Sequence, residues 1–178
     1  ACAFSLTHLA YEYPNETVPE GATPESHLAA LRDRLTEHGG PEVIVINPKV
    51  ALSQFEDASM HATRERILSD LCEADHENRF HIFYPVTAAG DPIYVHAKVM
   101  IVDDVLLHLG SSNINNRSMG FDTECDVSIT RPAAAITRFR DKLIAEHLGV
   151  AQPLFSDAVS EHRTLIQAIS TLNGDDGR

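Results

Sequence analysis

A histidine and a lysine two residues apart are the pair in this 178-residue chain whose types and spacing can best perform chemistry. His96 and Lys98 lie in Ile93 to Val102, where apolar residues alternate on a period of two, so we predict a strand there. Residues two apart on a strand share a face, roughly 6 to 7 Å from each other. An imidazole and an ammonium at that spacing suit one phosphate group.

The residues after this strand are predicted to turn back toward it. Asp103 and Asp104 separate two apolar runs, which is typical of a tight hairpin turn. Counting pairs from a two-residue turn places Ser111 opposite His96. Asn113 follows two residues later, so a hydroxyl and an amide are expected to return to the imidazole.

Six of these residues together resemble the HxKx4Dx6GSxN signature of the phospholipase D superfamily, with every spacing kept. They are His96, Lys98, Asp103, Gly110, Ser111 and Asn113. The match continues through Asn115–Gly120 and Asp122–Asp126, which resemble the continuation in bacterial phospholipases D and cardiolipin synthases. Six fixed residue types over eighteen positions make a specific pattern. The resemblance implies a phosphodiesterase or phosphatidyltransferase.

The resemblance also implies roles for the main side chains. In this family the equivalent of His96 either attacks phosphorus, forming a phosphohistidine, or protonates the leaving oxygen. Lys98 and the Asn113 amide would donate to the non-bridging phosphate oxygens and stabilise the transition state. Glu124 would be the carboxylate that orients the imidazole. We therefore expect His96, Lys98, Asn113 and Glu124 to be catalytic.

Other polar residues near the motif have supporting or ordinary interpretations. Asp103, at the turn, is expected to brace the hairpin rather than to touch substrate. Ser111 is expected to donate either to phosphate or to a neighbouring side chain, and Arg117 to contact substrate or to brace its loop. Asp122 and Asp126 share a face with Glu124 on a predicted strand, and a solvated acidic face explains them adequately.

A metal site is the alternative use of His96, Asp103 and Glu124, which are all competent ligands. Their spacing is not that of a closed zinc site, and a lysine two residues from the histidine would repel a dication. We therefore expect neither a metal nor another cofactor.

Composition limits the partners of the chain. It carries 26 acids and 14 bases, a formal charge of −12, which disfavours nucleic acid and anionic membrane surfaces. Three scattered cysteines are read as thiols. No apolar run approaches the roughly 20 residues that span a bilayer. A cytoplasmic or peripheral membrane location is expected.

Helical and strand patterns alternate along the chain and predict an α/β fold with a mixed sheet flanked by helices on both faces, as in a phospholipase D-like half domain. Residues 1–178 are expected to form one domain, with 1–24 poorly matched to the family and 173–178 a frayed tail. Strands are expected within Ala1–Tyr13 and at Val43–Ile46, Phe80–Tyr84 and Asp122–Ile129. Helices are expected from Pro24 to Gly39 and at Ser59–Glu73, Ala133–Leu148 and Ser156–Leu172. In the third of these, Ile136, Phe139, Leu143 and Ile144 should face inward.

The leading functional hypothesis is one catalytic half of an enzyme that hydrolyses or transfers phospholipid phosphodiesters through a phosphohistidine. In-line displacement at phosphorus calls for two imidazoles, and none of the other histidines is followed two residues later by lysine. The second half would be a missing N-terminal half or an identical chain in a homodimer. The alternatives are a single-motif homodimeric phosphodiesterase acting on nucleic acid and a non-catalytic dimerisation module.

Overall fold

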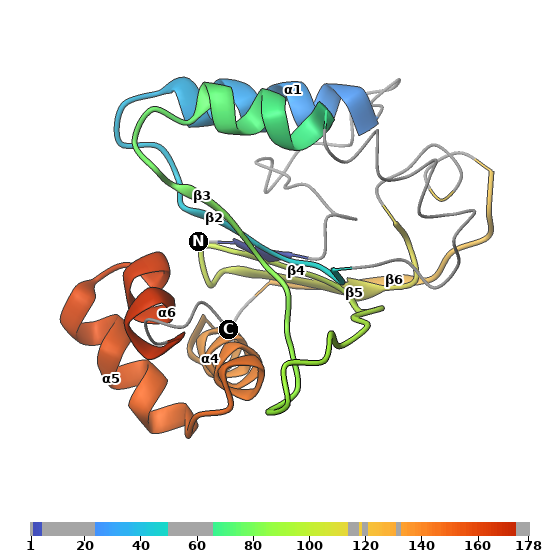
Figure 1. Ribbon diagram of the computed structural model, residues 1–178. Coiled ribbons are helices and arrows are strands. Elements are labelled where there is room, and N and C mark those ends of the chain that lie inside the picture. The colour runs from blue at the N-terminus through green and yellow to red at the C-terminus, as the bar shows by residue number, and fades with distance from the viewer. Residues whose placement is uncertain are drawn as a thin grey trace.

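The computed structural model describes residues 2–4, 24–49, 66–113, 118, 121–130 and 133–173. Its strands are β1 (Cys2–Phe4), β2 (Val43–Ile46), β3 (Phe80–Phe83), β4 (Lys98–Val102), β5 (Leu106–Gly110) and β6 (Asp126–Thr130). Its labelled helices are α1 (Pro24–Thr36), α4 (Ala133–Leu148), α5 (Gln152–His162) and α6 (Leu165–Asn173), and residues 66–74 are also helical. Figure 1 shows the elements together.

Three strands form a parallel sheet in the order β1-β2-β3, and β2 is buried on both of its faces. Val43 and Val45 pack with α1 and residues 66–74 in one core cluster, whereas Ile44 and Ile46 pack with α4, α5 and α6 in another. The apolar, β-branched run thus forms the doubly buried strand expected for it. Helices cover both faces (Figure 1), which confirms the predicted mixed α/β architecture.

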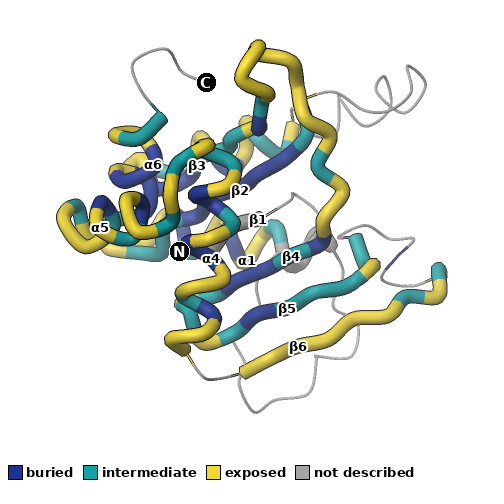
Figure 2. The backbone as a smooth tube through the Cα atoms, turned by 90° about the horizontal axis from the view of Figure 1, so that it is seen from below, coloured by how far each residue is buried: buried dark blue, intermediate teal, exposed yellow. Residues whose placement is uncertain are grey.

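The other sheet is antiparallel, in the order β4-β5-β6, and β4 lies beside β1. One face of the β4–β5 hairpin packs on helix α4, where Ile136 meets Ile101 and Leu107. On the opposite face Met100 joins the α1 cluster. Strand β6 is exposed along its whole length (Figure 2). In place of the single mixed sheet that was expected, a parallel sheet and an antiparallel sheet therefore adjoin where β1 lies beside β4.

Several predicted boundaries are wrong: α1 ends at Thr36 rather than at Gly39, and three further elements also differ. The motif strand begins at Lys98 rather than Ile93, because β5 ends at Gly110 and offers residues 93–97 no ladder partner. Strand β6 begins at Asp126, not Asp122. The last predicted helix, Ser156–Leu172, is two helices, α5 and α6. They are separated at Arg163, whose φ of 61° ends α5.

Helix α4 has the predicted bounds, and its inward face is as predicted for Ile136 and Ile144 but not for Phe139. Phe139, expected inside, is 36% exposed, whereas Arg140 and Asp141 are buried together with Ile136 and Ile144. The predicted helix Ser59–Glu73 is described only from residue 66, and its earlier part lies outside the described residues. No helix in the described ranges is long and apolar enough to cross a membrane.

Candidate active site

The ammonium of Lys98 lies against the imidazole of His96. Lys98 Nζ is 2.9 Å from His96 Nε2 and donates to the His96 carbonyl oxygen at 3.1 Å. Because an ammonium only donates, Nε2 is the acceptor in this contact. The Tyr94 ring stacks on the same imidazole, with centroids 5.9 Å apart. The expectation that His96 and Lys98 are neighbours is therefore met, although His96 precedes the strand.

The position of Lys98 at the start of β4 removes most of it from solvent. The residue is only 9% exposed, and burial lowers the pKa of its ammonium, an effect that the nearby charge of Glu124 partly opposes. A positive charge in a poorly solvated position attracts an anion more strongly than a charge in water does. This pair can thus bind an anionic group.

The hairpin returns in a register one residue away from the prediction. Lys98 pairs with Gly110 and Val102 with Leu106, so the loop contains Val105 as well as the two aspartates. A slip of one residue would turn the returning strand over and remove Leu107 from contact with α4. Packing under α4 therefore decides the register, and the bare backbone of Gly110 lies opposite Lys98.

Ser111 and Glu124 contact each other beside this pair. Ser111 Oγ donates to Glu124 Oε2 at 2.6 Å and accepts from the Cys125 amide at 3.0 Å. Of the two options left open for Ser111, this contact is the bond to a neighbouring side chain. Among the described residues the His96 ring is hydrogen-bonded to Lys98, and Glu124 acts on the pair through its charge on Lys98. Within the described residues, Glu124 is not hydrogen-bonded to the His96 imidazole, and its expected role in orienting the ring stays a prediction.

The remaining predicted residues lie in three different places. Asn113 follows the returning strand, half-buried, and makes no hydrogen bond within the described part of the chain. Asp103 is exposed in the turn with a φ of 48°, at the opposite end of β4 from Lys98. It therefore does not form a metal site with His96 and Glu124. Arg117 lies outside the described residues, as do most residues of the loop around it.

Sequence reasoning missed a buried charged network that holds the turn of the hairpin. Arg140 on α4 makes an ion pair with Asp104 and binds Asp141 Oδ1 through Nε at 3.0 Å and Nη2 at 2.8 Å. Ser156 on α5 donates to the other oxygen of Asp141 at 2.7 Å. A charged pair at inward positions of a helix was the available signal. This network ties the β4–β5 turn to two helices.

Sequence reasoning also missed the partners of Asp126. Its two carboxylate oxygens accept from the amide and the hydroxyl of Ser112, so it is not merely a solvated acid. His108 lies next to it, with Nε2 3.7 Å from Asp126 Oδ1 and Nδ1 2.8 Å from the hydroxyl of Ser128. The motif loop is thus held by a second carboxylate besides Glu124.

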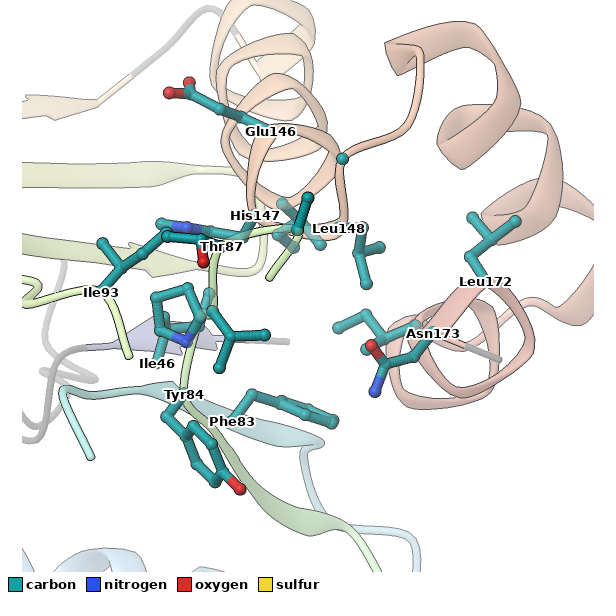
Figure 3. Close-up of a pocket in the computed structure, with 16 residues that line it drawn as sticks. Ile46, Phe83, Tyr84, Thr87, Ile93, Glu146, His147, Leu148, Leu172 and Asn173 are labelled. Atoms are coloured by element: carbon teal, nitrogen blue, oxygen red, sulfur yellow. The ribbon is translucent and has the colours of Figure 1, made fainter. Parts of the chain in front are cut away.

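A separate pocket of about 650 Å³ lies between the end of β3, the segment after it, α4 and α6 (Figure 3). Its walls are mostly apolar, and burial lowers the pKa of His147, which lines it. Ile93 also lines this pocket, and the next residue, Tyr94, stacks on His96. The pocket therefore adjoins the site through the backbone of this short segment.

Comparison with known proteins finds relatives that share one name. A phospholipase D of Phytophthora infestans is 36% identical over 93 residues, 42% of this chain and 5% of that protein. Phospholipase D alpha 3 of Arabidopsis thaliana is 43% identical over 82 residues, 39% of this chain and 10% of its own. Phospholipase D alpha 1 of Spuriopimpinella brachycarpa is 38% identical over 91 residues, 45% and 11% of the two chains.

The chain thus spans 5 to 11% of the length of these relatives. They come from plants and an oomycete, so the bacterial resemblance of the motif loop stays a prediction. No solved structure matches the chain significantly. A family model described as phospholipase D matches residues 69–174, more than half of the chain and the whole of the described site. The chain belongs to the phospholipase D family.

Proposed function

We propose that this chain is one catalytic half of an enzyme that hydrolyses or transfers phospholipid phosphodiesters. The observation that carries the proposal is the 2.9 Å contact between the buried Lys98 ammonium and the His96 imidazole. The pair combines a proton-transferring or nucleophilic group with an anion-binding group. Membership of the phospholipase D family supports the same reaction class.

The reaction proceeds in two displacements at phosphorus. When phosphate enters, the Lys98 ammonium donates to its non-bridging oxygens in place of His96 Nε2, and the Asn113 amide donates to the same oxygens. One imidazole attacks phosphorus, and the bond to the head-group oxygen breaks as a second imidazole protonates that oxygen. Water, or an alcohol, then attacks phosphorus, gives up its proton to the second imidazole and frees the first. His96 supplies one of the two imidazoles.

The other imidazole comes from a second half, because this chain contains a single motif. Apolar side chains are exposed near the motif loop and along β6, as such an interface requires: Phe121 is 90% exposed, Val127 56% and Ile129 40%. The second half is either an N-terminal half of a longer protein or an identical chain. Both place the phosphate between two motifs.

Lipid is a better substrate class than nucleic acid for this site. The formal charge of −12 opposes the release of counterions on which nucleic acid binding depends. The relatives carry the name phospholipase D. No observation favours the nucleic acid phosphodiesterase or the non-catalytic dimerisation module.

The test uses a phosphatidic acid ester with a p-nitrophenyl leaving group, which departs without protonation and so does not need the second half. If His96 is the nucleophile, the 178-residue chain releases one equivalent of nitrophenolate and gains a phosphatidyl adduct on His96 that mass spectrometry locates. His96→Asn forms no adduct.

If His96 is instead the acid, the chain forms no adduct. In that case His96→Asn lowers phosphatidylcholine cleavage by the enzyme with both halves, by at least about a hundredfold. An enzyme that keeps more than roughly a hundredth of its rate after this substitution contradicts the proposal. Faster cleavage of DNA than of short-chain phosphatidylcholine contradicts the substrate class.

A further inference from the structure

Gly110 and Asp126 face each other directly across strands β5 and β6. A Cβ atom on residue 110 would clash with the Asp126 carboxylate and lie 2.8 Å from the Asp126 Cα atom. The φ of Gly110 is not positive, so the backbone does not need glycine for its conformation. Glycine is required there because the Asp126 carboxylate lies over it and the Asp126 Cα atom approaches it closely.

From this position the Asp126 carboxylate binds both donors of one residue. The Ser112 amide donates to Oδ1 at 3.2 Å, and the Ser112 hydroxyl donates to Oδ2. Two residues earlier, Glu124 accepts from the Ser111 hydroxyl. Two carboxylates thus hold two successive serines, directly before Asn113, at a point where the β5–β6 ladder has ended.

We propose that Asp126 is a positioning residue, which fixes the backbone of Ser112 and through it the amide of Asn113. The proposal rests on the proposed function, in which Asn113 contacts phosphate. A side-chain donor stabilises a transition state only when it is held within about 0.5 Å of its working position. Gly110 belongs to the same arrangement, since it provides the space that the Asp126 carboxylate occupies.

Asp126→Ala in the 178-residue chain tests the clamp directly. Exchange of the Ser112 backbone amide, followed by NMR, should become at least about tenfold faster, because this amide donates to Asp126, while exchange within α4 should not change. Asp157→Ala removes an exposed acid on α5 and is the matched control. Unchanged exchange at Ser112 would overturn the proposal.

Orthophosphate binding separates positioning from simple electrostatics. Asp126 lies two strands from Lys98 in the same cross-strand row, since both residues pair with Gly110. Loss of its negative charge would by itself strengthen phosphate binding. A positioning role predicts the opposite sign, a loss of about tenfold in affinity for Asp126→Ala and a smaller loss for Asp126→Asn, which keeps one acceptor. Tighter phosphate binding by Asp126→Ala refutes positioning. A wild-type chain that binds no phosphate overturns the proposed function and the positioning role with it, whatever the exchange data show.

A double-mutant cycle tests the coupling with Gly110. In the wild-type background Gly110→Ala should lower Tm by several degrees, roughly 5 °C, because the new methyl group overlaps the Asp126 carboxylate. In the Asp126→Ala background the same substitution should lower Tm by less, because the carboxylate is gone and only the close approach to the Cα atom of residue 126 remains. Equal losses in both backgrounds would show that Gly110 does not depend on Asp126.

Discussion

Lys98 Nζ lies 2.9 Å from His96 Nε2, so the lysine that is expected to bind phosphate also occupies the nitrogen that is expected to react. Nε2 cannot accept from the Lys98 ammonium and react at phosphorus at the same time. An incoming phosphate must draw the ammonium away from the imidazole, which frees Nε2 when an anion is present. Substrate binding and release of Nε2 are thus coupled through one side chain.

Replacement of Lys98 by methionine should separate binding from stability. Methionine keeps the stem of the side chain and removes a charge whose pKa burial already lowers. We expect orthophosphate affinity to fall by at least about tenfold, because a charge-assisted hydrogen bond contributes about 1.5–3 kcal/mol. The free energy of unfolding should be unchanged or higher, since a poorly solvated charge is removed.

Lys142→Met is the control for this variant, because Lys142 is exposed on α4. Calorimetric titration with phosphate and urea unfolding give the two quantities. Phosphate affinity that survives Lys98→Met would exclude Lys98 as the anion-binding group.

The Arg140 network should be among the largest single contributions to the stability of this chain. Arg140→Met leaves Asp141, which is only 5% exposed, without its guanidinium partner, and frees the turn at Asp104. Removal of one partner from a buried ion pair typically costs about 3–5 kcal/mol. Urea unfolding measures the loss. Exposed Arg138 on the same helix provides a matched control, and Arg138→Met should change stability by less than about 0.5 kcal/mol.

His147 should make stability depend on pH in a defined direction. Burial lowers the pKa of His147 in the folded chain, so the unfolded chain binds its proton more readily. Neutral His147 therefore makes its full contribution to the free energy of unfolding above the unfolded pKa, about 6.5. This contribution is lost as pH falls below that value toward the folded pKa. His147→Gln should reduce the fall in unfolding free energy between pH 7 and pH 5, relative to wild type.

His76→Gln is the control for the pH experiment, since His76 is exposed. Subtracting the curve of each variant from that of wild type removes the contribution of the other titrating groups. A His147→Gln curve parallel to that of wild type would show that His147 titrates alike in both states.

The second half is expected to cover the apolar residues near the motif. If the partner is an identical chain, sedimentation should show a dimer at micromolar concentration, and Val127→Glu should convert it to a monomer and abolish turnover of phosphatidylcholine. If the partner is a separate half, the chain should sediment as a monomer without turnover. A monomer with full phosphodiesterase activity would contradict the need for two motifs.

Local patterns in the sequence determined much of this protein. The run at β2 predicted a strand buried on both faces, and the periodicity after Arg131 predicted the bounds of α4. The spacing of His96 and Lys98 predicted their contact, and Asp103 and Asp104 predicted the hairpin turn. These features depend on residues within a few positions of one another, so the local sequence is enough to predict them.

Only the tertiary structure decided features that depend on contacts between segments far apart in the sequence. Packing beneath α4 set the hairpin register one residue away from the count, and thereby placed Gly110 rather than a side chain opposite Lys98. The break between α5 and α6 also depends on a residue far away in the sequence. Glu42 accepts from the amides of Leu165 and Ile166 and thereby caps α6.

The carboxylates around the motif show why sequence reasoning could not assign their partners. Alternation put Glu124 and Asp126 on one face, but it could not say which donor each would meet. The last pair of the β5–β6 ladder is Gly110 with Asp126, and just beyond it the Ser111 hydroxyl donates to Glu124 while the Ser112 amide and hydroxyl donate to Asp126. Hydrogen-bond partners depend on where strands stop pairing, which is a property of the folded sheet and not of the residues alone.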